Sequence, residues 1–349
     1  MDILKECENA KRIGISGHIR PDGDCVGSCL AMWQYLTNNL PNAKVTVFLE
    51  KPADIFNEIK GYDEIDSTFL GTAGVKIDEI GAYEKNLGLN SEEDKADPAK
   101  GEDGDAQDRF DVFFALDCGA ERLGEAEKFF YMADKKINID HHISNQGTGD
   151  INLVRPEVGS VCEVVYELMD KKLIDKDIAM ALYIGIIHDT GVFQYSNTRP
   201  ETLQIASHLI TFGFDFPRLI EETFYQKTYV QSQIMGRTLM ESIRFMDGQC
   251  IVGVIEKKTM DFYGVNTKDL DGIVNQLRNI KGVHCAIFMY ESGVLEYKVS
   301  MRSDDKVDVS QVASFFGGGG HKRAAGCTMK GTFHDCVNNL SLHIAKQLA

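Results

Sequence analysis

The sequence lacks the long apolar runs of a membrane protein. No stretch of its 349 residues approaches the roughly 20 consecutive apolar residues that a membrane-spanning helix needs. The first residues, MDILKECENAKR, also lack the apolar segment of a secretory signal. We therefore expect neither an integral membrane protein nor a secreted one, and no membrane partner.

Paired cysteines are missing as well. The nine cysteines are scattered singly, and no CxxC motif occurs. This argues against a disulfide framework and against a zinc ribbon. Cys25 and Cys29 are four residues apart on a predicted helix, a spacing that favours packing over metal binding. Free thiols fit a reducing compartment best, so we expect a cytoplasmic protein.

Basic residues are scarce. The chain has 37 lysines and arginines against 53 aspartates and glutamates, a formal net charge of −16, and no basic run is visible. Non-specific binding to long DNA or RNA depends on a basic surface, so we expect no binding of long nucleic acids. An anionic substrate would have to be attracted locally, by metal ions and a few arginines.

Part of the negative charge is concentrated in residues 91–109. This segment, SEEDKADPAKGEDGDAQDR, holds eight acidic and three basic residues, and alanine is its only apolar residue type. Such a segment cannot bury enough apolar surface to offset the entropy lost on ordering. We predict a flexible, solvated insertion at the protein surface.

Strand and helix signals alternate through the first half of the chain. The expected strands are residues 12–18, 44–49, 111–117 and 136–140, and the expected helices are residues 25–36, 159–172 and 177–191. Ser160 is the expected N-cap of the second of these helices. The alternation predicts an α/β fold with an N-terminal, mainly parallel sheet flanked by helices. Ligand sites of such sheets lie at the carboxyl ends of the strands.

The pattern changes in the second half. Residues 213–245 predict a helical connector, and residues 246–349 mix strand and helix signals in a way typical of a smaller α/β domain. At about 150 residues per domain, the length also favours two domains. We therefore expect one domain at 1–212, which contains the insertion, and another at 246–349.

Residues able to bind metal ions follow several predicted strands and one predicted helix. A single aspartate at a strand end usually forms a turn or cap. Here the carboxyl ends of parallel strands would bring all of them to one edge of the sheet. Four carboxylates and two imidazoles are available there as ligands: His18, Asp22, Asp24, Asp117, His141 and Asp189.

This ligand set suits two divalent cations. Two such ions about 3.5–4 Å apart can share a bridging carboxylate and a bridging hydroxide. Four carboxylates balance the charge of two divalent ions, and mixed oxygen and nitrogen ligation suits Mn²⁺, with Mg²⁺, Co²⁺ and Fe²⁺ as alternatives. The absence of cysteine from the set argues against a structural zinc site.

The spacing within two motifs supports a dinuclear site. Asp22 and Asp24 are two residues apart in HIRPDGD, so a turn can direct them to different ions. In an extended chain the adjacent imidazoles of His141 and His142 cannot easily serve one ion. One of them can therefore bind metal while the other faces the substrate.

A glycine-rich segment, GGGGHKRAAG, occupies residues 317–326. Four consecutive glycines let backbone N–H groups approach a phosphate closely, and His321, Lys322 and Arg323 add donors and positive charge. A flexible glycine turn beside solvated basic residues is the alternative. Arg302 ends a predicted strand and gains a role only if it lies beside this segment.

The motifs HIRPDGD, LDCGAERLG, IDHHISN, HDTGVFQYSNT and GGGGHKRAAG resemble, in this order, those of the DHH phosphoesterase superfamily with its DHH-associated C-terminal domain. The resemblance covers nearly the whole chain. Length and layout are most similar to the branch of nanoRNases and pAp phosphatases, which are bifunctional oligoribonucleases. The resemblance implies a Mn²⁺-dependent enzyme that hydrolyses short oligoribonucleotides or dinucleotides to mononucleotides, and 3′-phosphoadenosine 5′-phosphate (pAp) to AMP.

The resemblance also implies a role for each site residue. One ion would be bound by His18, Asp22 and Asp117, and the other by Asp24, Asp117, His141 and Asp189. Asp117 would be the bridge, His142 would contact the scissile phosphate, and Asp140 would orient the imidazoles. In the second domain, the terminal phosphate and base of the substrate would be bound by Ser300, Arg302, Gly318, Gly319, His321 and Arg323.

Other functions stay open at this point. A phosphodiesterase for cyclic or linear dinucleotides would differ only in the fit of its cleft. A catalytically idle nucleotide-binding regulator would normally have lost an aspartate or histidine, whereas all six ligand residues are present. A dinucleotide-dependent oxidoreductase does not fit, because the glycine run opens no βαβ unit. The oligomeric state is open, and a homodimer is one alternative.

Overall fold

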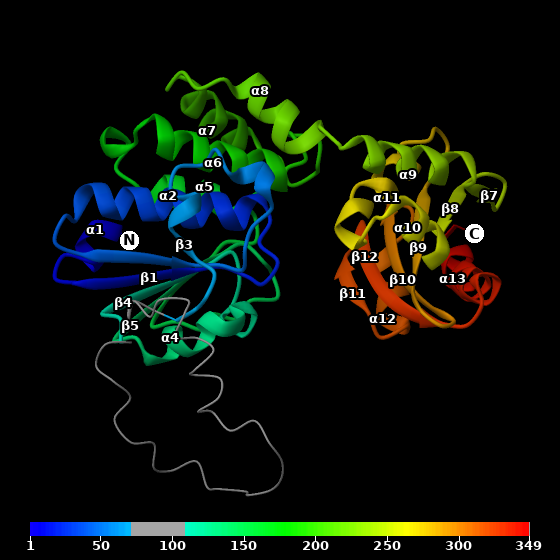
Figure 1. Ribbon diagram of the computed structural model, residues 1–349, viewed down its shortest axis with the longest axis horizontal. Helices are drawn as coiled ribbons and strands as arrows, with labels where there is room; N and C mark the ends of the chain where they lie inside the picture. Colours follow the sequence, from blue (N-terminus) through cyan, green and yellow to red (C-terminus); the bar gives the residue numbers. More distant parts are fainter. Residues whose placement is uncertain (71–108, 349) are drawn as a thin grey trace, which may run out of the picture. The chain divides into compact units, whose positions relative to one another are not determined.

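A computed structural model of the chain describes residues 1–70 and 109–348. The chain divides into two compact units, Met1–Gln226 and Lys227–Ala349 (Figure 1). Residues 91–108 of the expected acidic insertion lie outside the described residues. None of the helices described is long and apolar enough to cross a membrane.

The first unit contains a six-stranded parallel sheet. Its strands are β1 (Arg12–Ser16), β2 (Lys44–Phe48), β3 (Ile65–Asp66), β4 (Val112–Leu116), β5 (Lys135–Asp140) and β6 (Ile151–Val154). Their order is β3-β2-β1-β4-β5-β6, and every neighbouring pair is parallel. The strands are rich in β-branched and aromatic residues, which suit a pleated, buried surface. The predicted mainly parallel sheet is confirmed.

Helices cover both faces of this sheet, with α2, α5 and α6 on one side and α4 on the other (Figure 1). The α-helices are α1 (Ile3–Glu6), α2 (Gly23–Asn39), α4 (Glu127–Met132), α5 (Val161–Leu168), α6 (Lys176–Asp189), α7 (Pro200–Ile210) and α8 (Phe216–Ile220). Short 3₁₀ helices occupy Asp54–Phe56, Tyr62–Glu64, Ala120–Arg122, Gly124–Ala126 and Lys171–Leu173, and a π-helix occupies Glu221–Tyr225. The expected N-cap is confirmed, because the Ser160 hydroxyl accepts a hydrogen bond from the Glu163 amide at 3.3 Å.

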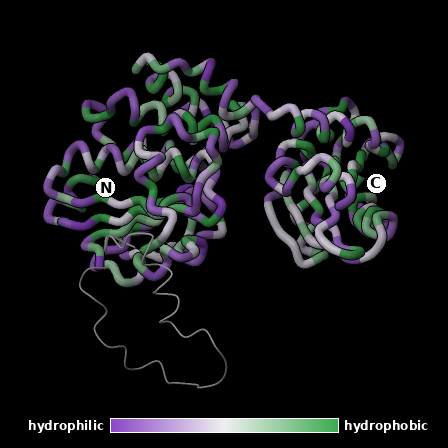
Figure 2. The backbone as a smooth tube through the Cα atoms, in the orientation of Figure 1, coloured by the Kyte–Doolittle hydropathy of each residue, from purple (hydrophilic) through white to green (hydrophobic). Residues whose placement is uncertain are grey.

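The two faces of the sheet have separate cores. Successive side chains of β4 point to opposite faces, so Phe114 joins the core under α2 while Phe113 joins an aromatic core with α4. Full burial of such a side chain contributes about 1.5–3 kcal/mol. Gly14 of β1 makes room for Phe113, since a Cβ there would lie 2.3 Å from its ring. Figure 2 shows hydrophobic stretches inside the unit and hydrophilic ones at its outer turns.

The strand order reverses between β1 and β4. From β1 the chain continues to β2 and β3 on one side of the sheet, and later from β4 to β5 and β6 on the other. The loops that follow β1 and β4 therefore run in opposite directions. In open α/β sheets, a ligand site forms at the carboxyl ends of the strands at this switch point.

The second unit is a smaller mixed sheet with helices on both faces. Its strands are β7 (Ile243–Phe245), β8 (Cys250–Ile255), β9 (Cys285–Gly293), β10 (Glu296–Ser303), β11 (Gly319–His321) and β12 (Ala324–Lys330), in the order β11-β12-β10-β9-β8-β7. Only the pair of β8 and β9 is parallel among the strand pairs described. Its helices are α9 (Tyr229–Met240), α10 (Lys257–Tyr263), α11 (Ile273–Arg278), α12 (Val309–Phe315) and α13 (Phe333–Leu348), besides a 3₁₀ turn at Thr267–Leu270. This confirms the expected smaller α/β part.

Alternating residues of β9 divide the second unit into two cores. Ile287 packs in a core that includes residues of α12 and α13, whereas Phe288 packs in one that includes residues of α9 and α11. The sequence segment expected as a connector, 213–245, contributes α8 and the π-helix to the first unit and α9 and β7 to the second.

Candidate metal centre

The carboxyl edge of the first sheet gathers all six predicted metal ligands. The ends of β1, β4 and β5 supply His18, Asp117 and His141. Helix ends supply Asp22 and Asp24 at the start of α2 and Asp189 at the end of α6. The site therefore lies at the switch point of the sheet, where the topology places a ligand.

Local backbone structure fixes two of these carboxylates. Asp22 is the N-cap of α2, and its Oδ1 accepts hydrogen bonds from the backbone N–H groups of Asp24 and Cys25, both at 3.1 Å. Asp117 has a φ of 63°, in the left-handed region that few non-glycine residues adopt. Such a conformation costs of order 1–3 kcal/mol and persists where the surroundings hold it. The Asp117 amide donates to the Ile139 carbonyl at 3.0 Å.

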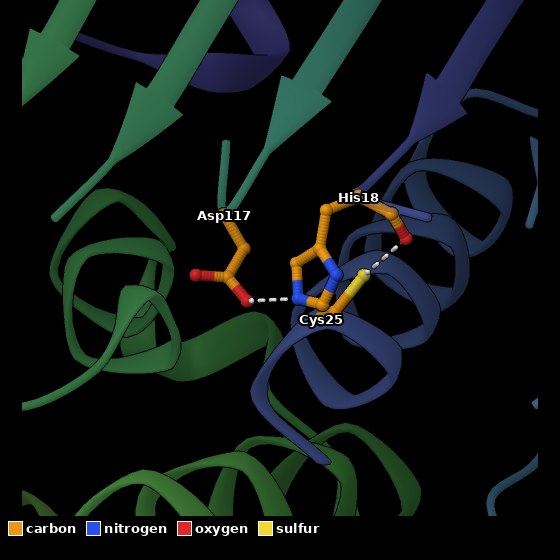
Figure 3. Close-up of side chains that lie close together, drawn as sticks. All are labelled: His18, Cys25 and Asp117. Atoms are coloured by element: carbon orange, nitrogen blue, oxygen red, sulfur yellow. Dashed lines mark hydrogen bonds and ion pairs between the residues drawn. The ribbon is translucent and has the colours of Figure 1, made fainter. Parts of the chain in front are cut away.

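His18, Asp22 and Asp117 form the first ligand group. His18 Nε2 lies 3.6 Å from Asp22 Oδ2 and 3.4 Å from Asp117 Oδ2, a contact visible in Figure 3. His18 Nδ1 lies 2.8 Å from the Ile19 carbonyl oxygen, which can only accept, so Nδ1 donates there. Nε2 is thereby left to face the two carboxylates, as a metal-binding histidine requires.

Asp24, Asp117, His141 and Asp189 form the second ligand group. His141 Nε2 lies 3.2 Å from Asp189 Oδ2, 3.5 Å from Asp117 Oδ1 and 3.9 Å from Asp24 Oδ2. Its Nδ1 lies 3.3 Å from the Val158 carbonyl oxygen, which again assigns the proton to Nδ1. Both imidazoles thus present Nε2 to carboxylates.

Asp117 belongs to both groups. Its Oδ2 faces His18, and its Oδ1 faces His141. The residue is 1% exposed, and Oδ1 is buried without a hydrogen bond from any described residue. A buried carboxylate oxygen without a donor is costly unless a cation satisfies it. Four carboxylates and two neutral imidazoles therefore fit two divalent cations that share Asp117.

The electrostatics of these side chains also show a need for positive charge. All ion pairs found for these four carboxylates among the described residues are with histidines. Burial disfavours a charged His18, but its bonds to Asp117 and Asp22 outweigh burial and raise its pKa to about 12. In the same way Asp117, Asp24 and Asp189 raise the pKa of His141 to about 11.

The carboxylates of the second group repel one another. Burial and the charge of Asp117 raise the pKa of Asp24 to about 7. Burial and the charge of Asp24 raise the pKa of Asp189 well above its usual range. Both shifts are those of acidic groups brought together before a cation neutralises them.

A helix start supports Asp24 from the protein side. Asp24 Oδ2 accepts from the Val161 amide at 2.5 Å, and Oδ1 accepts from the Cys162 amide at 3.0 Å. These amides open α5, where the helix dipole also favours a carboxylate. This contact could not be predicted from the sequence, because the two segments are far apart in the chain.

His142 is held by Asp140. His142 Nδ1 lies 2.8 Å from Asp140 Oδ1, and the backbone amides of His141 and His142 donate to the same oxygen at 2.6 and 3.1 Å. Asp140 is fully buried, and although burial opposes ionisation, the bonds from His142 and Asn145 lower the pKa of Asp140. The carboxylate thus fixes the turn that carries both histidines.

Two asparagines complete this support, and sequence reasoning did not single them out. Asn145 Nδ2 donates to Asp140 Oδ2 at 2.6 Å and to Asn138 Oδ1 at 2.9 Å. Asn138 in turn donates to the carbonyls of Ala115 and Cys118, on either side of Asp117. Asn145 lies within the IDHHISN motif, so its position beside the histidines was the available signal.

Cys25 lies beside the first ligand group (Figure 3). Ligand atoms of His18, Cys25 and Asp117 lie within 4.8 Å of one another. The Cys25 thiol donates to the His18 carbonyl at 4.0 Å, and burial raises its pKa well above the usual value. A protonated thiol is a poor metal ligand, so packing remains the better interpretation of this residue.

The second unit brings several predicted substrate-binding residues to one face of its sheet. Gly326 of β12 pairs with Gly319 of β11 on one side and with Ser300 of β10 on the other. Two residues along the strands, Ala324 of β12 pairs with His321 and with Arg302 in the same way. Residues two apart in a strand share a face. Ser300, Gly319, Arg302 and His321 therefore flank a strip of small residues.

The glycine segment itself differs from the predicted phosphate loop. Residues 319–321 pair with β12 as the short strand β11. A Cβ on Gly318 would lie 2.1 Å from the Gly326 carbonyl, and one on Gly320 would lie 2.5 Å from that of Ala324. These two glycines are needed for close approach to β12.

Arg323 is not brought to the strip of small residues. It lies in the turn between β11 and β12, and its Nη2 donates to Asp305 Oδ1 and Oδ2 at 2.7 and 2.6 Å. Lys322 Nζ lies 3.9 Å from the same carboxylate. Asp305 therefore pairs with Arg323 and Lys322, the two cationic side chains that were expected to contact a phosphate.

Comparison with known proteins agrees with this geometry. The sequence pattern of the DHH family, N-terminal domain, matches residues 12–186, and that of the DHHA1 domain matches residues 247–348. The chain belongs to the DHH family. The resemblance noted in the sequence is thus confirmed, and with it the enzyme class, a phosphoesterase.

Two relatives are each named bifunctional oligoribonuclease and PAP phosphatase NrnA. The protein from Thermus thermophilus is 32% identical over 200 residues, which cover 56% of this chain and 59% of the relative. The protein from Bacillus subtilis is 24% identical over 318 residues, which cover 89% of this chain and 87% of the relative. The match thus spans less than two thirds of the first relative and most of the second.

Solved structures share the fold. An exopolyphosphatase-related protein from Bacteroides fragilis is 25% identical, with a TM-score of 0.80, and the match covers 99% of this chain and 94% of that one. RecJ from Thermus thermophilus, solved in complex with Mn²⁺, is 12% identical, with a TM-score of 0.52 over 99% of this chain and 54% of that one. The second likeness concerns the fold alone.

Proposed function

We propose that this protein is a divalent-cation-dependent phosphoesterase that hydrolyses short oligoribonucleotides to mononucleotides and pAp to AMP. The observation that carries this proposal is the position of Asp117, whose two oxygens face two separate ligand groups. The names of the two NrnA relatives support the substrate class. The first unit would be the catalytic domain and the second the substrate-binding domain.

The two ligand groups would hold two cations, for which we propose Mn²⁺. When bound, such ions would polarise phosphate oxygens and lower the pKa of bound water, which would supply a nucleophile near neutral pH. The chain contributes fixed positions for the ligands. It holds both imidazoles in the tautomer that exposes Nε2, and it supports Asp24 by the amides of α5.

His142 would act on the substrate. Its Nδ1 is committed to Asp140, which leaves Nε2 to face the scissile phosphate. An imidazole held in this way can stabilise charge on the phosphate and donate a proton to the leaving oxygen. Asp140 would keep the ring in position.

The second unit would recognise the remainder of the substrate. The strip flanked by Ser300, Gly319, Arg302 and His321 offers small residues on which a base can lie, with donors on both sides. Arg323 would bind the terminal phosphate once it leaves Asp305. A catalytically idle regulator is disfavoured, since the six ligands and their supporting hydrogen bonds are all in place.

Product analysis tests this proposal. Ribonucleotides of two to ten residues, pAp and cyclic dinucleotides are each incubated with the full chain and Mn²⁺, and the products are separated by chromatography. We expect mononucleotides from the shortest RNAs and AMP from pAp. Turnover of cyclic dinucleotides alone, or no turnover of any of these, would contradict the proposal.

A further inference from the structure

The turn after the metal ligand Asp189 has an unusual backbone. Gly191, Val192 and Phe193 have φ values of 57°, 53° and 65°, so three consecutive residues lie in the left-handed region. For a β-branched residue such as Val192 this conformation is a clear outlier. Backbone strain of this kind persists only where surrounding contacts fix it, and it gathers at functional sites.

Thr190 holds the near end of this turn. Its hydroxyl donates to the Ile186 carbonyl at 2.6 Å and accepts from the Phe193 amide at 3.1 Å. Its carbonyl accepts from the amides of Gln194 and Tyr195, both at 2.9 Å. Thr190 is fully buried, so the turn is tied to the last turn of α6.

Asn197 closes the far end. Its Nδ2 donates to the Asp189 carbonyl at 3.1 Å and to the Gly159 carbonyl at 2.9 Å. One amide group therefore joins the segment that carries a metal ligand to a second segment of the chain. Its Oδ1 is buried and finds no donor among the residues that the structure describes.

The Gly159 peptide is held from its other side by Glu163. Glu163 Oε1 accepts from the Gly159 amide at 3.0 Å and from the Thr202 hydroxyl at 3.0 Å, and Oε2 lies 3.2 Å from Arg199 Nη2. A Cβ on Gly159 would lie 2.7 Å from Glu163 Oε1, so the site admits only glycine without rearrangement. The position of Gly159 is thus closely defined.

Gly159 leads directly into the helix that supports Asp24. Ser160 is the N-cap of α5, and the next two amides, of Val161 and Cys162, bind the Asp24 carboxylate. Asn197 therefore connects the backbone of Asp189 to the backbone that holds Asp24. These are two of the three acidic members of the second ligand group.

We propose that Asn197 is a positioning residue for the second cation, holding Asp24 and Asp189 at the distance that the ion requires. This inference rests on the proposed metal-dependent function. Neighbours of metal ligands that act in this way typically change metal affinity or activity by about 10- to 100-fold when they are removed. The first ligand group does not use Asn197 and should bind its ion normally.

The test is an equilibrium titration of the full chain with Mn²⁺ alone, in which calorimetry measures the binding of each ion. Asn197→Ala removes both hydrogen bonds, and the isosteric Asn197→Asp replaces the donor with an acceptor. We expect one of two Mn²⁺ ions to bind about 10- to 100-fold more weakly in both variants. At saturating Mn²⁺, the KM for pAp should stay close to that of the wild type.

The matched control is Asn152→Ala. Asn152, in β6 of the same unit, also makes two side-chain hydrogen bonds, both to Gly149 at 2.7 and 2.8 Å. This variant should lose thermal stability without losing Mn²⁺ affinity. If Asn197→Ala is too unstable to titrate, Asn197→Asp and the rise of its Tm with added Mn²⁺ serve instead, and that rise should be smaller than in the wild type.

Two results would overturn the inference and are distinguishable. If Asn197 variants bind both ions as tightly as the wild type and merely lower the Tm like Asn152→Ala, the residue is only structural. If the wild-type chain itself binds no Mn²⁺, the metal assignment fails, and the role of Asn197 fails with it.

Discussion

At the scale of single residues, each histidine of the site is oriented by the hydrogen bond of its Nδ1 atom, which determines what its Nε2 atom faces. His18 and His141 each donate from Nδ1 to a backbone carbonyl, so each offers Nε2 to carboxylates. His142 instead donates from Nδ1 to the buried Asp140, and its Nε2 is left for the substrate. The same residue type thus has two predicted roles, set by the partner of one ring nitrogen.

The division of roles predicts how loss of His142 appears in kinetics. His142→Ala should lower kcat by about 10²–10⁴, the usual scale for acid–base or charge-stabilising groups, with a smaller change in KM. The measurement is steady-state hydrolysis of pAp at saturating Mn²⁺. His208→Ala is the control, because His208 lies in the same unit and is hydrogen-bonded to Tyr166 at 3.0 Å. Equal losses of kcat in His142→Ala and His208→Ala would show that His142 takes no part in the chemical step.

The pKa shifts predict how pH acts on metal binding. Without a cation, the pKa of Asp24 rises from 3.8 to about 7 and that of His18 from 6.5 to about 12. Between the ordinary and the raised values the folded chain binds more protons than the unfolded chain, so these groups make stability fall as pH rises. Cations displace those protons, so Mn²⁺ affinity should rise over the same range.

The corresponding measurement is thermal unfolding from pH 5 to pH 8, with Mn²⁺ and with a chelator. We expect the difference in Tm between the two conditions to widen as pH rises. A constant or narrowing difference would show that the protons on Asp24 and His18 are not exchanged for the cation.

At the scale of helices and strands, the sequence predicted those features that depend on interactions between residues close together in the chain. The apolar runs that form β1, β4 and β5, and the N-cap Ser160, were predictable because they depend on neighbours in the chain. The grouping of His18, Asp117 and His141 after parallel strands was predictable from the geometry of such sheets.

Contacts between segments that are far apart in the chain could not be predicted from the sequence. The bonds from the amides of α5 to Asp24, and those from Asn138 to the carbonyls of Ala115 and Cys118, each join segments brought together by folding. Asp305 is a further example, since nothing in the sequence marks it as the partner of Arg323.

The Asp305–Arg323 contact yields a prediction at the same scale. A carboxylate whose two oxygens both accept from one edge of a guanidinium competes with a phosphate for that group. Asp305→Asn should therefore lower the KM for pAp, by about two- to fivefold for an exposed pair. Arg323→Ala should raise it about 10- to 100-fold, the loss of a charge-assisted contact.

A small chromogenic phosphodiester that occupies only the metal centre is the control substrate. Both the Asp305 and the Arg323 variant should hydrolyse it almost like the wild type. Equal loss of activity on pAp and on this ester would place Arg323 in the metal site or in the stability of the fold. An unchanged KM for pAp in Asp305→Asn would show that Asp305 does not compete with the substrate.

At the scale of the whole molecule, the proposed function requires an acidic chain to act on an anionic substrate. The net charge of −16 repels polyanions at long range, so attraction has to come from cations gathered at one edge of the first sheet. Four carboxylates at that edge add to the repulsion until divalent ions neutralise them. Metal binding and substrate binding are therefore expected to be coupled, and a two-cation centre that shares Asp117 is the core of this account.

An equilibrium titration of Mn²⁺ binding to the full chain tests that centre most directly. We predict two bound ions per chain in the wild type and at most one in Asp117→Ala, because one carboxylate faces both ligand groups. Circular dichroism of the variant verifies that it is folded. A single ion in the wild type, or two ions retained by a folded Asp117→Ala variant, would contradict the account.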